Sequence, residues 1–550
     1  MKPVLYIFDA AKKRPYLVPT LLALLLLLIP SWLRPVHLPD EARYAEVSRD
    51  VLVNNHWLIP HINGIPHLTK PPLFYDLAAL SFSILGKNFF AIRMVSLGAF
   101  LAGLLFCVYW AGKRGVPGAA ALTGLIGVTM FQPVVAGQYA DLNILMTAWI
   151  TLGLLCFYQA LERPLKRRWW YGAWIFFGLG FLTKGPPALM IPAGAIILYR
   201  LVSGRKFNRS PASWLAGILL YLAIAFPWYI WILLKEGEKL VQFWGIDIFH
   251  RTFASEEGPD AVPGYYIPVF LLGGAGWSVL AIYEIYIVHR RAKEKETKGV
   301  LPDRSFQKSS RPDIKKPGKI RRIAHSTLLE ARKMPSDQLW LACWFIATVI
   351  PFSLLLAEMI SYIQPCYPAF TLFLALYYAR KKENGYLKRI RYTFLISFLL
   401  IAAILWGVSL VGVTEIRSPS LEVGESLAKH LEPHWIGLKL RRIEEGTFTL
   451  VQYDDYCPLY SFMSNCPTIL VEETIHEEWT APPELAASME ELNQWVKQNR
   501  PLVFLFEPER LDLFTGKEWE NLNLIYKGSH YVLMSTKSLD SFWERELKPD

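Results

Sequence analysis

Long apolar runs separated by short polar or basic segments dominate this chain up to about residue 414 of its 550 residues. Each run is roughly 18–23 residues long, the length that an α-helix needs to cross about 30 Å of hydrocarbon. The pattern predicts about eleven membrane-spanning helices, and up to about thirteen. The runs lie at approximately 16–34, 89–111, 117–136, 144–161, 169–183, 186–203, 213–234, 265–289, 338–358, 363–380 and 392–414.

The first two runs are joined by a polar segment, 35–88, that is itself patterned. Residues 41–54 carry apolar side chains at helical spacing, with Asp40 in front as a helix-starting residue. Residues 73–85 form a second apolar stretch that is too short to cross a bilayer comfortably. We expect two helices that lie in the membrane interface.

The chain changes character after residue 414. The segments 447–453, 468–472, 502–506 and 522–533 favour strands, and 488–498 has the spacing of an amphipathic helix. The predicted fold is therefore an all-α polytopic membrane bundle over 1–414, followed by a small α/β domain over 415–550. Cys457 and Cys466 lie in the second part, and the sequence leaves open whether they form a disulfide.

Composition and charge fit a membrane protein. Hydrophobic residues make up 53% of the chain and charged residues only 19%, which excludes a set of ordinary soluble domains. Basic residues fall on every second connection, including the long loop 290–336. The positive-inside rule then places the N-terminus in the cytoplasm, and Asp40 and 415–550 on the opposite side of the membrane. The net charge of +11 thus needs no nucleic-acid partner.

Charged side chains gather in the polar segment between the first two runs. Asp40, Glu41 and Arg43 follow the first run closely, and Lys70 precedes a pair of prolines. Such charges are costly at a bilayer surface without partners, which favours their use on a charged substrate. Arginine and lysine suit a phosphate, and a carboxylate can accept a proton from a nucleophile. The alternatives are helix capping for the acids and snorkelling to lipid headgroups for the cations.

Further polar residues lie at the predicted outer ends of later runs. Tyr139, Asp141 and Asn143 surround the start of the fourth run, Lys184 lies between the fifth and sixth, and Tyr362 precedes the tenth. Each is either part of a polar site or an ordinary interfacial residue.

The loop that follows the seventh run is long and aromatic. It contains Arg251 and ends at Tyr265 and Tyr266. Long connections in compact bundles are usually functional or disordered, and the aromatic content argues against disorder. Aromatic faces beside polar groups are typical of sugar recognition.

Several kinds of site are missing from the sequence. We find no Gly-rich nucleotide loop, no zinc-ligand pair and no nucleophile elbow. A transferase that faces away from the cytosol has no nucleotide-sugar supply, so its donor must be carried on a lipid. A polyprenyl phosphate fits, with apolar grooves for its tail and cations for its phosphate. The sequence requires no cofactor, predicts no metal ligands and leaves a need for a divalent metal open.

Several motifs together resemble a known family. The stretch from Pro39 to Glu46, the pair Lys70-Pro71, the triplet Thr183-Lys184-Gly185 and the triplet Ser361-Tyr362-Ile363 occur in the order found in lipid-carrier-dependent glycosyltransferases of the GT-C superfamily. The likeness covers nearly the whole chain. It is strongest to the bacterial enzymes that transfer 4-amino-4-deoxy-L-arabinose to lipid A, which are relatives of protein O-mannosyltransferases.

The resemblance implies roles for individual residues. Asp40 would be the acid needed for catalysis, and Arg43, Lys70 and Tyr362 would hold the donor phosphate. The family's second acid falls where this chain has Asn143, with Asp141 two residues earlier. A family glutamate near a metal is replaced here by Thr69, and its histidine partner by Asp260, so the resemblance carries no zinc site over to this chain.

Together these observations predict an inverting glycosyltransferase at the outer face of the inner membrane. It would pass a sugar from a polyprenyl phosphate, undecaprenyl phosphate first of all, to a lipid A, glycan or protein acceptor. The alternatives are a lipid-linked sugar flippase and a non-catalytic envelope scaffold. The predicted site comprises the catalytic candidates Asp40, Glu41 and Asp141, the donor-phosphate candidates Arg43, Lys70, Tyr362 and Lys184, and the sugar or acceptor candidates Tyr44, Tyr139, Asn143, Arg251, Tyr265 and Tyr266.

Overall fold

A computed structural model of the chain describes most of 2–414, with gaps at 35–39, 63–64, 245–263, 298–329, 355–358 and 382–383, and separate pieces of 449–537. The chain packs into two compact units. Unit 1 comprises 1–30 and 96–407, and unit 2 comprises 31–95 and 408–550. The boundaries fall inside three helices, α2, α5 and α19. The predicted division at 414 stays a prediction.

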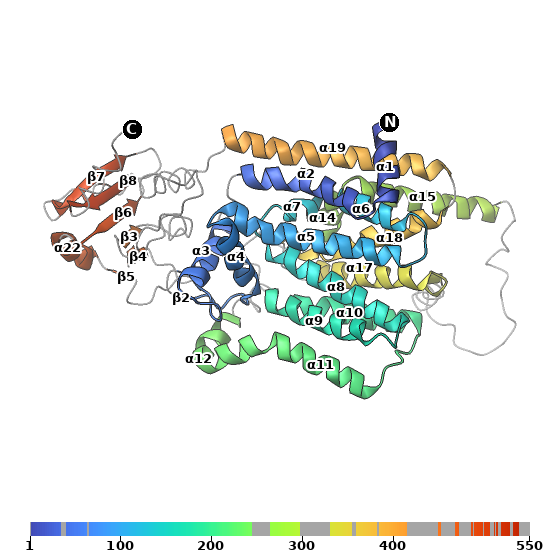
Figure 1. Ribbon diagram of the computed structural model, residues 1–550, viewed down its shortest axis with the longest axis horizontal. Coiled ribbons are helices and arrows are strands. Elements are labelled where there is room, and N and C mark those ends of the chain that lie inside the picture. Colours follow the sequence, from blue (N-terminus) through green and yellow to red (C-terminus); the bar gives the residue numbers. More distant parts are fainter. Residues whose placement is uncertain are drawn as a thin grey trace. The chain divides into compact units, whose positions relative to one another are not determined.

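Unit 1 is made of helices (Figure 1). Within it α8 packs on α9, α9 on α11, α10 on α17, and α17 on α18, and α8 to α11 run alongside one another. Large aromatic side chains such as Trp170 and Trp340 are fully buried between these helices. The helices that lie wholly or mainly in this unit are α1 (Lys2–Lys13), α2 (Leu17–Leu33), α5 (Phe89–Gly112), α6 (Ala119–Gly127), α7 (Phe131–Ala136), α8 (Leu142–Glu162), α9 (Arg167–Lys184), α10 (Pro187–Ser203), α11 (Pro211–Ala225), α12 (Pro227–Trp244), α14 (Tyr266–Gly273), α15 (Gly276–Thr297), α17 (Ser336–Leu354), η2 (Ile360–Ile363), α18 (Cys366–Arg380) and α19 (Asn384–Thr414).

Every apolar run of the sequence contains helix, but three of the runs are broken. The run 117–136 is divided into α6 and α7, and the run 213–234 bends by 47° between α11 and α12, where Pro227 begins the second helix. The run 265–289 bends by 107° between α14 and α15, at Ala275 with its positive φ of 50°. A proline removes a backbone donor, and a left-handed residue ends a helix, but neither feature changes the hydrophobicity of the run. The apolar pattern therefore predicted no break at either place.

The number of spans therefore depends on how bent helices are counted. Within the described residues, three helices are long and apolar enough to cross a membrane, or five if each of two bent pairs is one span. Three further apolar helices, α2, α10 and α4 (Leu73–Leu85), are shorter than 18 residues and are not among these five. The chain is a multi-pass membrane protein, and the figure of about eleven spans remains a prediction.

The first part of unit 2 carries the two helices expected between the first two runs. They are α3 (Asp40–Val53) and α4, which pack against each other. Between them β1 (His61–Ile62) and β2 (Ile65–Pro66) form a small antiparallel pair. The helix α3 begins at Asp40, so this acid lies in its first turn, where a negative charge favours the helix dipole.

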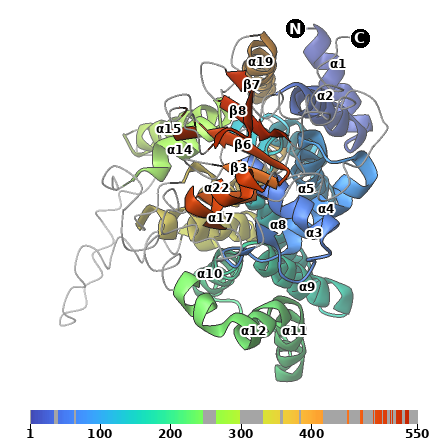
Figure 2. The same cartoon turned by 90° about the vertical axis from the view of Figure 1, so that its left-hand side faces the viewer.

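The second part of unit 2 contains a six-stranded mixed sheet in the order β5-β4-β3-β6-β8-β7. Figure 2 shows β6, β8 and β7 side by side. The helix α22 (Met489–Lys497) buries Leu492 and Val496 in a cluster with Phe504 of β6. The strands are β3 (Thr449–Gln452), β4 (Thr468–Val471), β5 (Ala486–Ala487), β6 (Leu502–Phe506), β7 (Leu522–Lys527) and β8 (Val532–Thr536).

These elements match the pattern of the sequence except at two points, of which the first is that the short strand β5 was not expected. The segment 522–533, expected as one strand, is two antiparallel strands, β7 and β8. Cys457 and Cys466 lie outside the described residues. Among the described residues, Cys107, Cys156, Cys343 and Cys366 are buried free thiols.

Candidate active site

The first turn of α3 presents Asp40 and Arg43 together. They form an ion pair across one helical turn, and their side chains are 37% and 28% exposed. The guanidinium group of Arg43 also lies 5.7 Å from the ring centre of Tyr44. Its Nε atom is buried and has no hydrogen-bond partner among the residues that the structure describes. A buried N–H donor of this kind can donate to an oxygen of an anionic ligand.

Lys70 lies in the loop between β2 and α4, close to a histidine that the sequence did not single out. His67 is buried, and its Nε2 atom lies 3.1 Å from both the Tyr75 hydroxyl and the Thr69 Oγ1 atom. Burial, together with the positive charges of Arg43 and Lys70, lowers the pKa of His67 to about 3. We name Arg43, His67 and Lys70 the cationic loop cluster. The positive charges of Arg43 and Lys70 favour the neutral form of the His67 imidazole.

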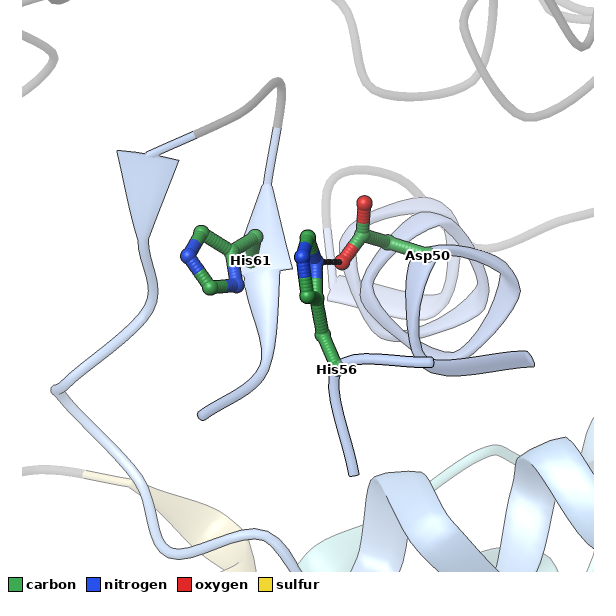
Figure 3. Close-up of side chains that lie close together, drawn as sticks. All are labelled: Asp50, His56 and His61. Carbon is green, nitrogen blue, oxygen red and sulfur yellow. Dashed lines mark hydrogen bonds and ion pairs between the residues drawn. The ribbon is translucent and has the colours of Figure 1, made fainter. Parts of the chain in front are cut away.

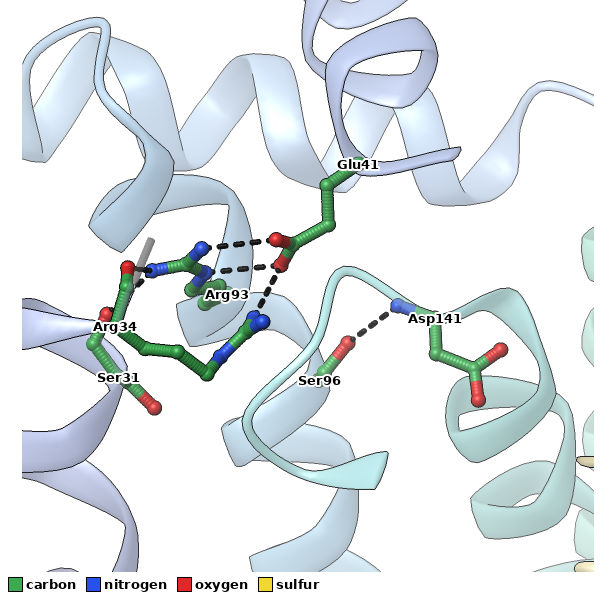
Figure 4. Close-up of polar contacts among 6 residues, drawn as sticks. All are labelled: Ser31, Arg34, Glu41, Arg93, Ser96 and Asp141. Carbon is green, nitrogen blue, oxygen red and sulfur yellow. Dashed lines mark hydrogen bonds and ion pairs between the residues drawn. The ribbon is translucent and has the colours of Figure 1, made fainter. Parts of the chain in front are cut away.

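Glu41 has a different environment from its neighbour Asp40. Its side chain is 1% exposed and accepts hydrogen bonds from Nε and Nη2 of Arg93 at 2.9 and 2.8 Å. Arg34 donates to the same carboxylate at 2.9 Å. We name these three residues the Glu41 triad (Figure 4).

Arg93 of the triad also binds backbone. It donates to the carbonyl oxygens of Ser31 and Arg34 at 2.8 and 2.9 Å. The triad therefore ties the start of α3 to the segment that follows α2 and to α5. This arrangement favours a structural role for Glu41 over the catalytic role that the sequence suggested.

A second polar cluster lies in unit 1 at the start of α8. Asp141 is the N-cap of this helix, and its Oδ1 atom accepts from the backbone and side-chain nitrogens of Asn143, both at 2.7 Å. Its Oδ2 atom accepts from Gln364 at 3.0 Å, and its own N–H donates to Ser96 (Figure 4). Burial raises the pKa of Asp141 above its ordinary value, although these bonds and the charge of Lys184 oppose the shift.

Asn143 connects this acid to two further predicted residues. Lys184, the last residue of α9, donates to the Asn143 side-chain oxygen, and its Nζ atom lies 4.4 Å from the ring centre of Tyr362. The Asn143 amide donates to Ser361 at 2.9 Å. We name Asp141, Asn143, Lys184 and Tyr362 the Asp141 cluster. The structure thus brings together four predicted site residues from α8, α9 and η2.

The remaining predicted residues are placed as follows. Tyr44 and Tyr139 are half-buried, and Arg251 lies outside the described residues. Tyr265 and Tyr266 contact each other edge to face, with ring centres 5.1 Å apart. The hydroxyl of Tyr266 donates to the Met359 carbonyl at 3.2 Å, and its side chain is buried, which is typical of a packing residue.

Sequence reasoning missed the partners of Glu41 and the role of His67. One signal was available for Arg93, because it is a charged residue inside an otherwise apolar run and such a residue needs an anionic partner. No comparable signal marked His67, since a lone histidine in a loop has many uses.

Comparison with known proteins gives the lineage of this chain. A family model described as dolichyl-phosphate-mannose-protein mannosyltransferase matches residues 69–231. The undecaprenyl phosphate-α-4-amino-4-deoxy-L-arabinose arabinosyl transferase of Photorhabdus laumondii is 24% identical over 93% of this chain and 87% of its own length. The enzyme of the same name from Edwardsiella ictaluri is 29% identical over 68% of this chain and 62% of its own. Alignments with three further relatives of that name span 56 to 58% of those relatives.

The fold has a solved counterpart. The crystal structure of ArnT from Cupriavidus metallidurans bound to undecaprenyl phosphate superposes with a TM-score of 0.70. That match covers 97% of this chain and 99% of the other, at 16% identity. The resemblance stated from the sequence motifs is therefore confirmed, as are the enzyme class and the helical membrane fold.

Proposed function

We propose that this chain, a GT-C-type membrane glycosyltransferase related to the bacterial aminoarabinose transferases, transfers a sugar from undecaprenyl phosphate to an acceptor at the outer face of the inner membrane. The names of its relatives make 4-amino-4-deoxy-L-arabinose the first donor sugar to test and lipid A the first acceptor. A glycan or protein acceptor uses the same donor chemistry. The proposal places the N-terminus in the cytoplasm, and the loop between α2 and α5 and the α/β domain 415–550 outside.

The observation that carries the proposal is the cationic loop cluster. Two cations, Arg43 and Lys70, act on one buried neutral histidine, and the buried Nε atom of Arg43 has no acceptor among the described residues. A phosphodiester group that links sugar and lipid would bring further negative charge and acceptor oxygens to these two cations, of which Arg43 already pairs with Asp40. Arg43 and Lys70 are therefore the proposed ligands of the donor phosphate.

The reaction is a single displacement. The acceptor oxygen attacks the anomeric carbon of the sugar, and the bond between that carbon and the phosphate oxygen breaks with inversion. The carrier leaves as undecaprenyl phosphate, whose growing negative charge Arg43 and Lys70 stabilise. Asp40 accepts the proton of an acceptor hydroxyl. When the acceptor is itself an ionised phosphate, there is no proton to remove, and Asp40 positions the acceptor instead.

The Asp141 cluster has a proposed role of its own. Its carboxylate is bound by amides and its lysine lies over a tyrosine ring, so it offers a carboxylate, an amide and an ammonium group on rigid helix ends. Such a set of groups suits the hydroxyl and amino groups of a sugar, and Lys184 and Tyr362 remain candidates for a phosphate oxygen. Glu41, by contrast, is proposed to hold α3 in place.

Purified protein in lipid nanodiscs tests this function. Undecaprenyl phosphate carrying a labelled aminoarabinose is supplied with lipid A, with a peptidoglycan precursor or with neither acceptor. Labelled lipid A formed by the wild type, and not by Lys70→Ala, supports the proposal and identifies the acceptor. No labelled product with either acceptor, in a preparation whose unfolding midpoint is normal, contradicts it for these substrates.

A further inference from the structure

A group of metal-ligating side chains lies in unit 2, apart from the residues assigned above. Asp50, His56 and His61 each offer one ligand atom, and these three atoms all lie within 4.8 Å of one another. Figure 3 shows His56 between the other two side chains. Their spacing in the sequence matches no zinc-finger pattern, so the grouping is a product of the fold.

The chain turns back sharply to bring these residues together. Asp50 lies in the last turn of α3, and Asn55, just beyond the helix, has a left-handed φ of 59°. Asparagine tolerates this conformation, which ends a helix and reverses the direction of the chain. His56 therefore returns over the end of α3, and β1, which packs on α3, begins with His61.

The three side chains contact one another in series. The Oδ2 atom of Asp50 lies 2.7 Å from Nδ1 of His56, and the rings of His56 and His61 have centres 4.0 Å apart. Asn54 donates to the other oxygen of Asp50 at 2.7 Å and so fixes the orientation of the carboxylate. Hydrogen bonds from surrounding residues that orient a ligand in this way are usual around metal sites.

Burial leaves the group accessible from one side. The side chain of Asp50 is 4% exposed, whereas that of His56 is 37% exposed. A buried carboxylate at the base and a histidine at the surface allow an ion to enter from solvent. They also leave room for a water molecule as an additional ligand.

We propose that Asp50, His56 and His61 form a zinc-binding site. Two nitrogen ligands and one carboxylate oxygen suit Zn²⁺ with water as fourth ligand, whereas Mg²⁺ and Ca²⁺ prefer sites made of oxygen atoms alone. Two ligands at about 2.1 Å from a zinc ion can be at most about 4.2 Å apart, so the ligand atoms need shifts of about 1 Å. Zinc bound to Nδ1 of His56 and Oδ2 of Asp50 would replace the hydrogen bond between these two atoms.

Bound zinc would join the end of α3 to β1, within the segment that carries Asp40 at one end and Lys70 at the other. The ion would therefore limit the motion of this segment without taking part in glycosyl transfer. The inference stands independently of the proposed reaction, since a zinc site and a transferase activity can be tested separately.

The test is direct binding of Zn²⁺ to the full-length protein, purified in detergent without a histidine tag and stripped of metal. We expect one Zn²⁺ per chain, displacement by excess Co²⁺ with a spectrum of tetrahedral nitrogen and oxygen ligation, and no competition from Mg²⁺. Asp50→Asn, His56→Ala and His61→Ala should each weaken binding at least about 100-fold, since even changes in the residues that orient zinc ligands cost about 10–100-fold. His289→Ala, at an exposed histidine of α15, is the matched control and should bind as the wild type does.

Thermal unfolding separates loss of a ligand from loss of the fold. Zn²⁺ should raise the unfolding midpoint of the wild type and of His289→Ala but not that of His61→Ala, whose midpoint without metal should stay near that of the wild type. If His61→Ala does not fold, the milder His56→Gln provides the same comparison. The proposal is overturned if the wild type binds no zinc in a saturable manner, or if both histidine variants bind it as tightly as the wild type.

Discussion

The Glu41 triad and the cationic loop cluster each contain two cations, yet their environments differ. In the triad, Arg34 and Arg93 share a carboxylate that is 1% exposed, so the charge and the acceptor oxygens of Glu41 are satisfied within the protein. In the cluster, Arg43 and Lys70 lie around a histidine whose pKa they and burial lower to about 3, so the central group is neutral. Asp40 supplies the negative charge there through its ion pair with Arg43.

The comparison separates charges that hold the fold from charges suited to a ligand. A buried carboxylate between two guanidinium groups is costly to disturb and contributes nothing to a substrate that it cannot touch. Cations around a neutral imidazole keep their attraction for an anion. Adjacent residues of one sequence motif, Asp40 and Glu41, therefore have different environments: Asp40 is 37% exposed and pairs with Arg43, whereas Glu41 is 1% exposed and pairs with Arg93.

The largest expected effect is on catalysis. Asp40→Asn should lower the rate of transfer to a hydroxyl acceptor by about 10²–10⁴-fold, the usual contribution of a positioned general base. Its unfolding midpoint should stay within a few degrees of the wild type because Asp40 is partly exposed. The check is the initial rate of labelled product formation, with Asp9→Asn as a control at an exposed acid of α1 that pairs with Lys12. Equal rates for Asp40→Asn and wild type would show that Asp40 is not the general base of the reaction.

Glu41→Gln should act on stability instead. The variant leaves two buried guanidinium groups without a counter-charge, and breaking a buried ion pair from one side costs about 3–5 kcal/mol. We expect a clearly lower unfolding midpoint in detergent and little folded protein at elevated temperature. Asp9→Asn breaks a solvent-exposed pair and should change stability by less than about 1 kcal/mol. An unchanged unfolding midpoint for Glu41→Gln would contradict the stabilising role of the Glu41 triad.

His67 makes the stability of the loop depend on pH. The folded protein keeps it neutral down to about pH 3, whereas in the unfolded chain it gains a proton near pH 6.5. Protons therefore favour the unfolded state as the pH falls below 6.5, by about 1.4 kcal/mol per pH unit from this group. Unfolding midpoints measured between pH 7 and pH 5 should fall less steeply in His67→Gln than in the wild type. Parallel curves would show that His67 is not held neutral.

The smallest expected effect is a change in the pH dependence of transfer when the Asp141 cluster loses its lysine. Burial raises the pKa of Asp141, and the charge of Lys184 opposes that shift. Lys184→Met should therefore raise the pKa of Asp141 further. If transfer needs the ionised carboxylate, the acidic limb of the rate against pH moves to higher pH in this variant. A profile of unchanged shape would indicate that Asp141 does not titrate in the reaction.

The sequence predicted much of this molecule because membrane helices and motifs leave strong local signals. The helices α3 and α4 and the strands β3, β4 and β6 follow from patterns within the chain, whereas the association of Asp141 with Lys184 was not predicted and is seen only in the fold. The bends between α11 and α12 and between α14 and α15 do not, since the hydrophobicity pattern shows neither the effect of Pro227 nor the left-handed φ of Ala275. The structural partners of Glu41 were also missed, because Arg34 and Arg93 are far from each other in sequence and meet only in the fold.

The most direct test of the central claim is the stoichiometry of transfer by the purified wild-type protein. The account predicts one undecaprenyl phosphate released for each sugar that reaches the acceptor. With a hydroxyl acceptor, Asp40→Asn should form both products about 10²–10⁴-fold more slowly at an unchanged unfolding midpoint. If the wild type instead moved the intact lipid-linked sugar across a vesicle membrane without releasing undecaprenyl phosphate, the protein would be a flippase and the proposed mechanism would be wrong.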